Sequence, residues 1–471
     1  MNLRIALIFP NINYLGKIIK VSLVPPLGLA YLAAVVEKAG YNVSVIDASA
    51  LNLNDDKLMA KLKEFKPDVI GITTNILLSL QNLHLSRLIQ RQMPTVKLVF
   101  GGPWASAVYE MLLRKSFCDY VIVGEGEHAF LELLKALEKG ESPKKKSGIS
   151  YLDPITKSVQ LEPPRPIEDL DTLPFPAWHL FPSPKKYFFH TRKKVFYPIT
   201  TSRGCPYQCN HCTKIIHGTR VRFRSVKNVI NEIRYLKEKF SASELLIVDD
   251  NFTVNKKRAE KILDEIIRNN FKLLLNFGNG LRADTLNQHL IRKFKQAGTY
   301  FIAIGVESGN QQVVNKIGKN LDLNAVRRAA KLIKQEKLVL TTFFMIGHPF
   351  DTVKTMNDTI NFAIEVDPDY PVFSKVTALP GTELYNLIKR EGRFLSRFGA
   401  IAGYQRSKAN FEIYDLKADD VDRMFKQAYR RFYFRPRKML SLLTSMRTFV
   451  EFKYILTQGI LIILNLLHLS Q

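Results

Sequence analysis

Three of the four cysteines of this chain lie close together, at Cys205, Cys209 and Cys212, in the spacing C-x3-C-x2-C. Such short spacings let one loop present several thiolates to one metal site, as the cysteine runs of iron–sulfur proteins do. The fourth cysteine, Cys118, lies far upstream. A 4Fe-4S cluster held by three thiolates keeps one iron without a protein ligand, so a small molecule can be chelated there. The run therefore predicts a loop folded around such a cluster.

The same thiolates also fit a second kind of metal site. Together with His211 or His217 they would complete the four ligands of a tetrahedral zinc ion. A zinc-stabilised protein that binds membranes or nucleic acid is therefore an alternative from another functional class. The two hypotheses differ in colour, because an iron–sulfur protein is brown and a zinc protein is colourless. Both fit a reducing compartment, so we expect a cytoplasmic protein.

Residues 1–140 alternate short apolar runs with helical patterns. The expected strands cover residues 5–9, 43–46, 69–73, 98–100 and 120–123, and the expected helices cover residues 27–39, 55–65, 80–92, 105–115 and 127–139. The apolar runs are rich in Val and Ile and nearly continuous, as buried parallel strands are. The pattern predicts a five-stranded doubly wound (Rossmann-like) α/β domain, whose ligand lies beyond the carboxyl ends of its strands.

Glycines stand at that edge of the predicted sheet. Gly28 opens the first helix, Gly101 and Gly102 follow the fourth strand, and Gly124 with Glu125 follows the fifth. Glycine permits a tight turn or a close approach of the backbone to a ligand. These residues are therefore the candidate ligand contacts of the first domain.

A linker and a second βα series follow. Residues 141–197 carry a lysine run and many prolines, which predict a proline-rich linker. Within residues 198–390 the expected strands cover residues 198–202, 244–249, 273–278, 300–305, 338–345 and 371–376, with helical patterns between them. Six βα units in succession predict a partial (β/α)6 barrel, whose chemistry lies at the carboxyl ends of its strands. The cysteine run follows the first of these strands, so its position agrees with that rule.

Polar residues follow the other strands of this barrel. Asp249 and Asp250 end the second strand, Arg282 follows the third, and Glu307 ends the fourth. Because the carboxyl ends of parallel strands meet at one edge, we expect these side chains to surround the cysteine run. His348 follows the fifth strand, where acid–base chemistry is an option, but a single histidine in a turn is more often structural.

Two sets of motifs give the chain a family resemblance. The cysteine run, with "DDNF", "RAD" and "GVESG", is similar to the radical S-adenosylmethionine (SAM) superfamily. The stretches "PPLGLAYLAA", "GGP" and "VIVGEGE" resemble the cobalamin-binding domain that precedes the barrel in one large subfamily. The resemblance covers about residues 1–390. It departs at His211, because the position before the third cysteine is often aromatic in the superfamily.

The resemblance implies a 4Fe-4S cluster whose open iron binds SAM. Electron transfer from that cluster would cleave SAM to a 5'-deoxyadenosyl radical. The residues that the resemblance assigns are Cys205, Cys209 and Cys212 for the cluster and catalysis, and Asp249, Asp250, Arg282 and Glu307 for SAM. The alternative for the acidic residues is that they cap helices or pair with local lysines.

The resemblance also implies cobalamin in the first domain. Its contacts would come from Gly28, Gly101, Gly102, Gly124 and Glu125. Some cobalamin proteins carry Asp-x-His-x-x-Gly after the first strand, and that histidine ligates the cobalt from below. Residues 11–16 of this chain contain no histidine, so we expect cobalamin without a histidine lower ligand. A degenerate domain that has lost the cofactor is the alternative, since a fold does not certify a site.

By the same resemblance the chain would methylate an unactivated carbon. A hydrophobic, lipid- or isoprenoid-like small molecule is the expected substrate, because the end of the chain is basic and apolar. The alternative within the family is a cyclase or rearrangement enzyme that transfers no methyl group, and the mass of the product separates the two. An electron donor such as flavodoxin or ferredoxin is the expected partner.

The last expected region, residues 391–471, is basic, aromatic and helical in pattern. The whole chain has a formal net charge of +26, which attracts anionic partners. Residues 454–468 carry no acidic or basic side chain except His468 and are interrupted by polar residues, so an interfacial helix is favoured over a bilayer span. We expect peripheral contact with the inner face of a membrane, with a helix packed on the protein or on a second subunit as the alternative. No known DNA- or RNA-binding module occurs, so no specific nucleic acid is expected.

Overall fold

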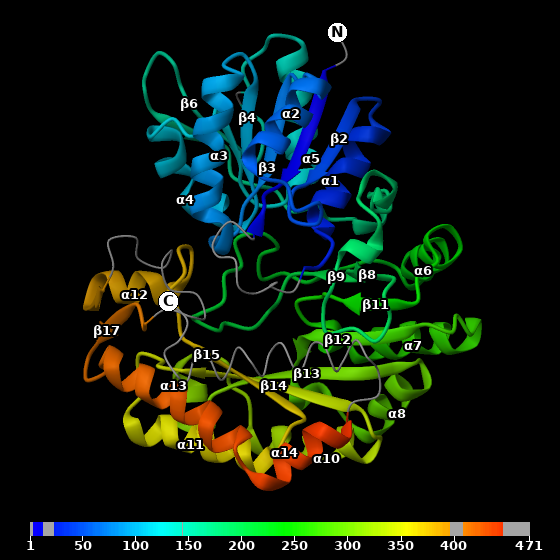
Figure 1. Ribbon diagram of the computed structural model, residues 1–471, viewed down its shortest axis with the longest axis vertical. Coiled ribbons are helices and arrows are strands. Elements are labelled where there is room, and N and C mark those ends of the chain that lie inside the picture. Colours follow the sequence, from blue (N-terminus) through cyan, green and yellow to red (C-terminus); the bar gives the residue numbers. More distant parts are fainter. Residues whose placement is uncertain (1–2, 13–22, 144, 396–407, 446–471) are drawn as a thin grey trace. The chain divides into compact units, whose positions relative to one another are not determined.

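The structure is a computed structural model that describes residues 3–12, 23–143, 145–395 and 408–445. The chain forms two compact units (Figure 1). The first unit comprises residues 1–189 and 213–222, and the second comprises residues 190–212 and 223–471. The cysteine run belongs to the second unit, and the segment directly after it returns to the first.

The first unit is a seven-stranded sheet in the order β2-β1-β3-β4-β5-β6-β7 (Figure 1). Its strands are β1 (Arg4–Phe9), β2 (Asn42–Asp47), β3 (Val69–Thr73), β4 (Lys97–Gly101), β5 (Tyr120–Ile122), β6 (Ile149–Leu152) and β7 (Val159–Leu161). The helices are α1 (Leu27–Lys38), α2 (Asp55–Phe65), α3 (Ser79–Gln92), α4 (Pro103–Arg114) and α5 (Gly126–Glu138). Strands β1 to β5 are parallel, so the predicted doubly wound domain is confirmed.

The strand order of this sheet places its ligand-binding edge. The chain crosses from β2 over β1 to β3, so the order reverses between β1 and β3. In open parallel sheets ligands bind beyond the carboxyl ends of the strands at such a reversal. The strands there are buried and apolar, and Ile5 and Leu7 of β1 pack with Phe130 of α5 in the core.

The predicted linker over residues 141–197 is partly wrong. Its first part contains β6 and β7, which extend the sheet in antiparallel orientation from β5. These strands are short and lie beside prolines and lysines, so the local sequence resembles a loop. Backbone pairing makes them strands, because β6 pairs with β5 and β7 pairs with β6. The first unit as a whole extends to residue 189.

The second unit contains a six-stranded parallel sheet in the order β15-β14-β13-β12-β11-β8 (Figure 1). Its strands are β8 (Phe196–Ile199), β11 (Glu244–Ile247), β12 (Leu274–Leu281), β13 (Thr299–Glu307), β14 (Val339–Ile346) and β15 (Tyr370–Lys375). The two edge strands, β8 and β15, each have one neighbour in this order, so the sheet is an open, partial barrel as predicted. The short strands β9 (Ser202–Arg203) and β10 (Arg222–Phe223) flank the cysteine run in sequence.

The helices of this unit begin at capped positions. They are α6 (Val226–Phe240), α7 (Lys256–Asn269), α8 (Gln288–Gln296), α9 (Gln311–Lys316), α10 (Leu323–Gln335) and α11 (Val353–Val366). The caps Ser225, Asn255, Asn287, Asn310, Asp322 and Thr352 all accept hydrogen bonds from the first turn. Each such cap contributes about 1 kcal/mol and fixes where its helix begins. All of these helices except α10, which follows α9, come after strands, so their capped ends lie toward the carboxyl edge of the sheet.

The region after β15 is not helical throughout. It contains α12 (Glu383–Glu391), an antiparallel pair of β16 (Gly392–Phe394) and β17 (Phe411–Ile413), then α13 (Ala418–Tyr433) and α14 (Pro436–Ser445). Helix α13 packs on β15, and Tyr429 and Tyr433 donate hydrogen bonds to backbone oxygens of that strand at 3.0 Å. The expected interfacial helix over residues 454–468 lies outside the described residues. No helix in the described part of the chain has both the length and the apolarity needed to cross a bilayer.

Candidate active site

The loop that carries the three cysteines, residues 204–212, is held on one side by two acidic residues at the end of β11. The carboxylate of Asp249 accepts hydrogen bonds from the backbone N–H and the hydroxyl of Thr201 and from the hydroxyl of Ser202, each at 2.6 Å. Asp250 accepts one from the N–H of Gly204 at 3.0 Å. Asp249 is buried, and burial raises its pKa, while its hydrogen-bond donors oppose that shift. Asp249 therefore supports the loop, whereas exposed Asp250 is the one open to a ligand.

The other side of the cysteine loop rests on the segment after α9. The N–H of Asn210 donates to the carbonyl of Ile317 at 3.0 Å, and the N–H of Leu384 donates to the carbonyl of Asn210 at 2.9 Å. Gly318 has a φ of +74°, and a Cβ at this position would lie 2.3 Å from the carbonyl oxygen of Gln208. Glycine is therefore required where this segment passes the loop.

One thiol of the loop, that of Cys209, has a lowered pKa. A hydrogen bond with Cys212 and, against the effect of burial, the charge of Lys319 lower the pKa of Cys209 to about 6. The same pairing raises the pKa of Cys212, so the two sulfurs share one proton. Cys205 and Cys209 are half-buried and Cys212 is exposed. In the described residues, no three His, Cys, Asp or Glu side chains are gathered closely enough to hold a single metal ion. Thiolates that ligate a cluster bind different irons, so this donor set fits the three-cysteine cluster.

Glu307 and Lys319 form a buried ion pair beside these thiols. Their Oε1 and Nζ atoms lie 2.8 Å apart, and both side chains are nearly buried. Burial opposes ionisation of Glu307, but the charge of Lys319 and its hydrogen bond oppose this effect, and the pKa of Glu307 is lowered. A Cβ on Gly305 would lie 2.8 Å from Glu307 Oε1 and 2.9 Å from Lys319 Nζ, so glycine makes room for the pair.

The backbone of Glu307 is strained. Its φ is +72°, and the register between β13 and β14 shifts at Gly305 and Glu307. A side chain larger than glycine in the left-handed region costs about 1–3 kcal/mol, and such positions cluster at functional sites. The bend directs the carboxylate of Glu307 toward Lys319 and away from the regular pleat of the strand. The sequence predicted Glu307 as a site residue, but it gave no sign of this strain or of Lys319.

Arg282 lies at the same edge, and its guanidinium is bound by other protein groups. Its guanidinium forms two hydrogen bonds with Asp284, at 3.1 and 2.8 Å, and donates to the carbonyl of Lys319 at 2.8 Å. It also covers the ring of Tyr207, 3.7 Å from the ring centroid. Arg282 therefore connects the cysteine loop to the Lys319 segment, and its contacts in this structure are to protein groups.

His211, which belongs to the cysteine loop, packs against a second histidine, His348. The rings of His211 and His348 lie 5.7 Å apart at their centroids and are inclined by 55°. His348 is completely buried. Within the described parts of the chain, neither of its ring nitrogens has a hydrogen-bond partner, and Nδ1 of His211 has none either. Burial lowers the pKa of both imidazoles, and the nearby charge of Lys319 adds to this effect. The pair is therefore neutral.

The glycines predicted as ligand contacts in the first unit serve different purposes. Gly102 has a φ of +98°, and a Cβ there would lie 2.6 Å from the carbonyl oxygen of Thr74. Gly101 accepts hydrogen bonds from the N–H and hydroxyl of Thr74, each at 2.8 Å. These two glycines join the ends of β4 and β3. No described atom lies within 4 Å of the position that a Cβ on Gly28 would take, so this turn of α1 leaves room for a ligand. A Cβ on Gly124 would lie 2.9 Å from the side chain of Pro164.

Three unpredicted side chains at this carboxyl edge have buried polar atoms that find no hydrogen-bond partner among the residues that the structure describes. They are Gln81 and Asn82 in the first turn of α3 and Trp104 in the first turn of α4, and all are buried. Helices α3 and α4 follow the adjacent strands β3 and β4, so these turns lie at the ligand-binding edge. Buried polar atoms are nearly always hydrogen-bonded in native proteins. Cobalamin is rimmed by amide groups, and these atoms fit it as donors and acceptors.

Glu125 forms a buried ion pair within the first unit. Its carboxylate lies 2.7 Å from the guanidinium of Arg222, and both side chains are almost completely inaccessible. The carboxylate also accepts a hydrogen bond from the N–H of Ile167 at 2.7 Å and contacts His217 at 3.0 Å. Glu125 therefore holds residues 213–222 against its own unit. The sequence could not signal this, since the partners are 97 residues apart.

Family models match both units. The B12-binding domain model matches residues 21–134, and the radical SAM superfamily model matches residues 199–363. An uncharacterised methyltransferase of Pyrococcus horikoshii is 31% identical over 441 residues, which cover 93% of this chain and 94% of that protein. This chain belongs to the radical SAM enzymes that carry a B12-binding domain. Membership of this family does not support the alternative hypothesis of a zinc-stabilised binding protein.

Other relatives and structures of this radical SAM family agree with the fold. The anaerobic magnesium-protoporphyrin IX monomethyl ester cyclase of Rubrivivax gelatinosus is 26% identical, covering 92% of this chain and 77% of that protein. The radical SAM methyltransferase TsrM of Kitasatospora setae, solved with cobalamin and a [4Fe-4S] cluster, has a TM-score of 0.72 at 16% identity, covering 93% of this chain and 90% of that chain. The cobalamin-dependent SAM radical enzyme OxsB has a TM-score of 0.76 at 16% identity, covering 99% of this chain and 72% of that chain.

Substitution of Arg222 should destabilise this radical SAM enzyme. Arg222→Met leaves the Glu125 carboxylate buried without its charge partner, which costs about 3–5 kcal/mol of unfolding free energy. Urea denaturation followed by circular dichroism measures this loss. Arg220→Met is the matched control, because its ion pair with Glu168 is exposed and contributes below about 1 kcal/mol. Equal losses for the two variants would contradict the structural role of the buried pair.

Substitution of Asn82 should separate stability from cofactor binding. Asn82→Leu removes buried polar atoms that have no protein partner, so the apo-protein keeps its stability, while cobalamin affinity falls about tenfold with each lost hydrogen bond. Equilibrium dialysis with cobalamin and thermal unfolding of the apo-protein measure the two effects. Gln92→Leu, at the exposed far end of α3, is the control. Unchanged affinity in Asn82→Leu would rule out this contact.

Proposed function

We propose that this enzyme transfers a methyl group to an unactivated carbon, with cobalamin, SAM and a 4Fe-4S cluster as its cofactors. The observation that carries the proposal is the cysteine loop, whose thiol of lowered pKa lies beside the buried Glu307–Lys319 pair. When bound, these cofactors supply radical activation of a C–H bond and the methyl group to be transferred. The protein's own residues hold, orient and desolvate the reacting groups.

Each group of residues has a distinct task in this proposal. Cys205, Cys209 and Cys212 ligate three irons of the cluster. Glu307 and Asp250 present carboxylates to the cationic groups of SAM, and Lys319 offers a cation to its carboxylate. Because Glu307 and Lys319 are already paired and buried, they lose little conformational freedom when a zwitterionic ligand replaces their mutual contact.

The substrate in this proposal is hydrophobic and lipid- or isoprenoid-like. One supporting observation is the hopanoid C-3 methylase of Methylococcus capsulatus, a relative at 24% identity that covers 78% of this chain and 69% of that protein. The other is the C-terminal part of the second unit, which exposes apolar side chains beside cations. A low-potential one-electron donor such as flavodoxin or ferredoxin is the partner that the cluster requires.

A ring-forming reaction is the second candidate function. It is favoured by the cyclase relatives, of which the Rubrivivax protein covers most of this chain. Both candidates use the same cofactors, so they differ only in the product. Only methyl transfer increases the mass of the substrate by one methyl group, and mass spectrometry of products from a labelled SAM methyl donor separates them.

Cofactor loading tests the proposed function. After anaerobic reconstitution with iron, sulfide and cobalamin, we expect about four irons and one cobalt per chain, a brown colour, and loss of iron in Cys205→Ala. Cys118→Ala is the matched control, since this cysteine is buried in the first unit and burial raises its pKa. Metal analysis and the absorption spectrum provide the measurement. Zinc without iron would refute the proposal, and iron without cobalt would remove methyl transfer.

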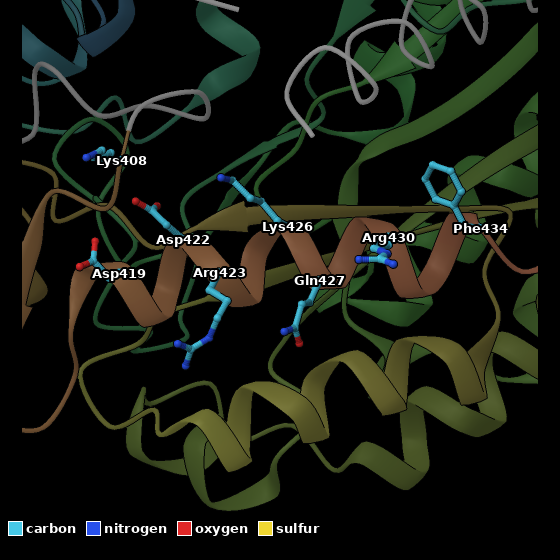
Figure 2. Close-up of a pocket in the computed structure, with 8 residues that line it drawn as sticks. All are labelled: Lys408, Asp419, Asp422, Arg423, Lys426, Gln427, Arg430 and Phe434. Carbon is cyan, nitrogen blue, oxygen red and sulfur yellow. The ribbon is translucent and has the colours of Figure 1, made fainter. Parts of the chain in front are cut away.

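The cytoplasmic enzyme also contacts an anionic membrane surface through α13 and α14 in this proposal. A hollow of about 630 Å³ lies along α13. Figure 2 shows the side chains that line it: Lys408, Asp419, Asp422, Arg423, Lys426, Gln427, Arg430 and Phe434. Four basic and two acidic side chains stand in this lining, so its charge favours anions. Phe434, Met439 and Leu440 are large apolar side chains that are more than half exposed. Cations beside exposed apolar groups are typical of interfacial helices.

Vesicle binding tests this contact. Arg430→Glu combined with Phe434→Ser reverses one charge and removes one apolar group, so partitioning onto vesicles rich in phosphatidylglycerol should fall at least about tenfold. Co-sedimentation of the full-length protein provides the measurement. Lys331→Glu, an exposed charge reversal on α10, is the matched control. Equal binding by the two variants would exclude this face, and equal binding to phosphatidylcholine would exclude charge recognition.

A further inference from the structure

The backbone of the buried residue His348 is held by its own turn. Its backbone N–H donates to the carboxylate of Asp351 at 2.8 Å, its carbonyl accepts from the Asp351 N–H at 2.8 Å, and Gly347 donates to the same carboxylate at 3.1 Å. Asp351 in turn accepts from the hydroxyl of Thr355 at 2.7 Å. The turn therefore fixes the backbone on both sides of His348 and leaves only its ring to interact with the site.

That ring has no hydrogen-bond partner among the described residues, although an imidazole always carries at least one N–H donor. Its exposed fraction is 0%, so bulk water does not satisfy it. Buried polar groups without partners are rare in native proteins, and each calls for a ligand, a water or a functional role. The aromatic neighbour of His348 at this point is His211, whose Nδ1 is also buried without a partner.

His211 brings the pair of histidines next to the cysteines. His211 lies between Cys209 and Cys212 in the sequence, and it interacts electrostatically with Glu307 and Lys319. An apolar aromatic ring at this position would carry no N–H donor. The two imidazoles in contact therefore place buried polar ring nitrogens beside the cysteine run.

We infer that His348 positions His211 so that His211 donates a hydrogen bond to a sulfur of the cluster held by Cys205, Cys209 and Cys212. This inference rests on the proposed cluster. A donor to a cluster sulfur stabilises the reduced state, which carries one more negative charge, and so raises the reduction potential. In the reduction the oxidised cluster accepts one electron from the external low-potential donor, and neither histidine gains or loses a proton. His348 is a positioning residue in this scheme.

A redox titration of the reconstituted full-length enzyme tests the inference. Without SAM, each sample is reduced stepwise with dithionite in the presence of mediators, and the reduced cluster is measured by electron paramagnetic resonance. In His211→Phe we expect the ratio of reduced to oxidised cluster at the wild-type midpoint to fall about tenfold, which is 59 mV for one electron. His348→Phe should shift it in the same direction, and the double variant should shift it no further than His211→Phe, because the two residues act as one unit.

Two further variants separate hydrogen bonding from packing. His211→Gln keeps an N–H donor and should restore the wild-type potential. Thr342→Val is the matched control, because it also removes a buried polar atom without a partner, on the strand that precedes His348, and should leave the potential unchanged.

The outcomes distinguish this inference from the proposed function. A wild-type protein that binds no iron refutes the proposed cluster. Full iron content with unchanged potential in both phenylalanine variants overturns the role of the pair. If the phenylalanine variants lose iron, His211→Gln decides: iron and potential like those of the wild type support the hydrogen bond, and loss of iron here too assigns the pair to packing and overturns the inference.

Discussion

The three hydrogen bonds that Asp249 accepts from Thr201 and Ser202 connect the sheet of the second unit to its cysteine loop. A carboxylate at 3% exposure has lost its water, and burial raises its pKa. The loop supplies the donors that compensate for this loss, so the charge and the loop conformation depend on each other. Asn210 and Gly318 fix the far side of the loop through backbone contacts alone. The thiols are thus presented by a segment that is held from both sides.

Two other buried carboxylates of the molecule also depend on protein groups that compensate for their lost water. Glu307 with Lys319 in the second unit and Glu125 with Arg222 in the first are both enclosed pairs with short contacts. The two pairs differ in their surroundings. Glu125 has additional protein partners and stays in place, whereas Glu307 sits on a strained backbone next to the thiols. A buried charge with many partners stabilises a fold, and one with a single partner at a strained position is suited to exchange that partner for a ligand.

Much of this could be predicted from the sequence. The parallel strands are continuous apolar runs, and the cysteine spacing is local, so both appear in any short window. The strands β6 and β7 were missed because their neighbours in sequence resemble a loop, and they become strands only through the pairing of β6 with β5 and of β7 with β6. Likewise, Glu125 and Asp249 were expected to face cofactors, and the structure shows protein donors on their carboxylates.

The sequence by itself determined the two-unit α/β architecture, the cluster loop and the family, because these depend on periodicity and on residues close together in the chain. Only the tertiary structure decided which residues share a site: Lys319 with Glu307, Arg222 with Glu125, His348 with His211, and the unpartnered atoms of Gln81 and Asn82. The physical reason is that burial and hydrogen-bond satisfaction are properties of contacts between distant segments. Whether a polar residue forms a buried ion pair, has a strained backbone or keeps a polar atom without a partner is decided only when the fold encloses it.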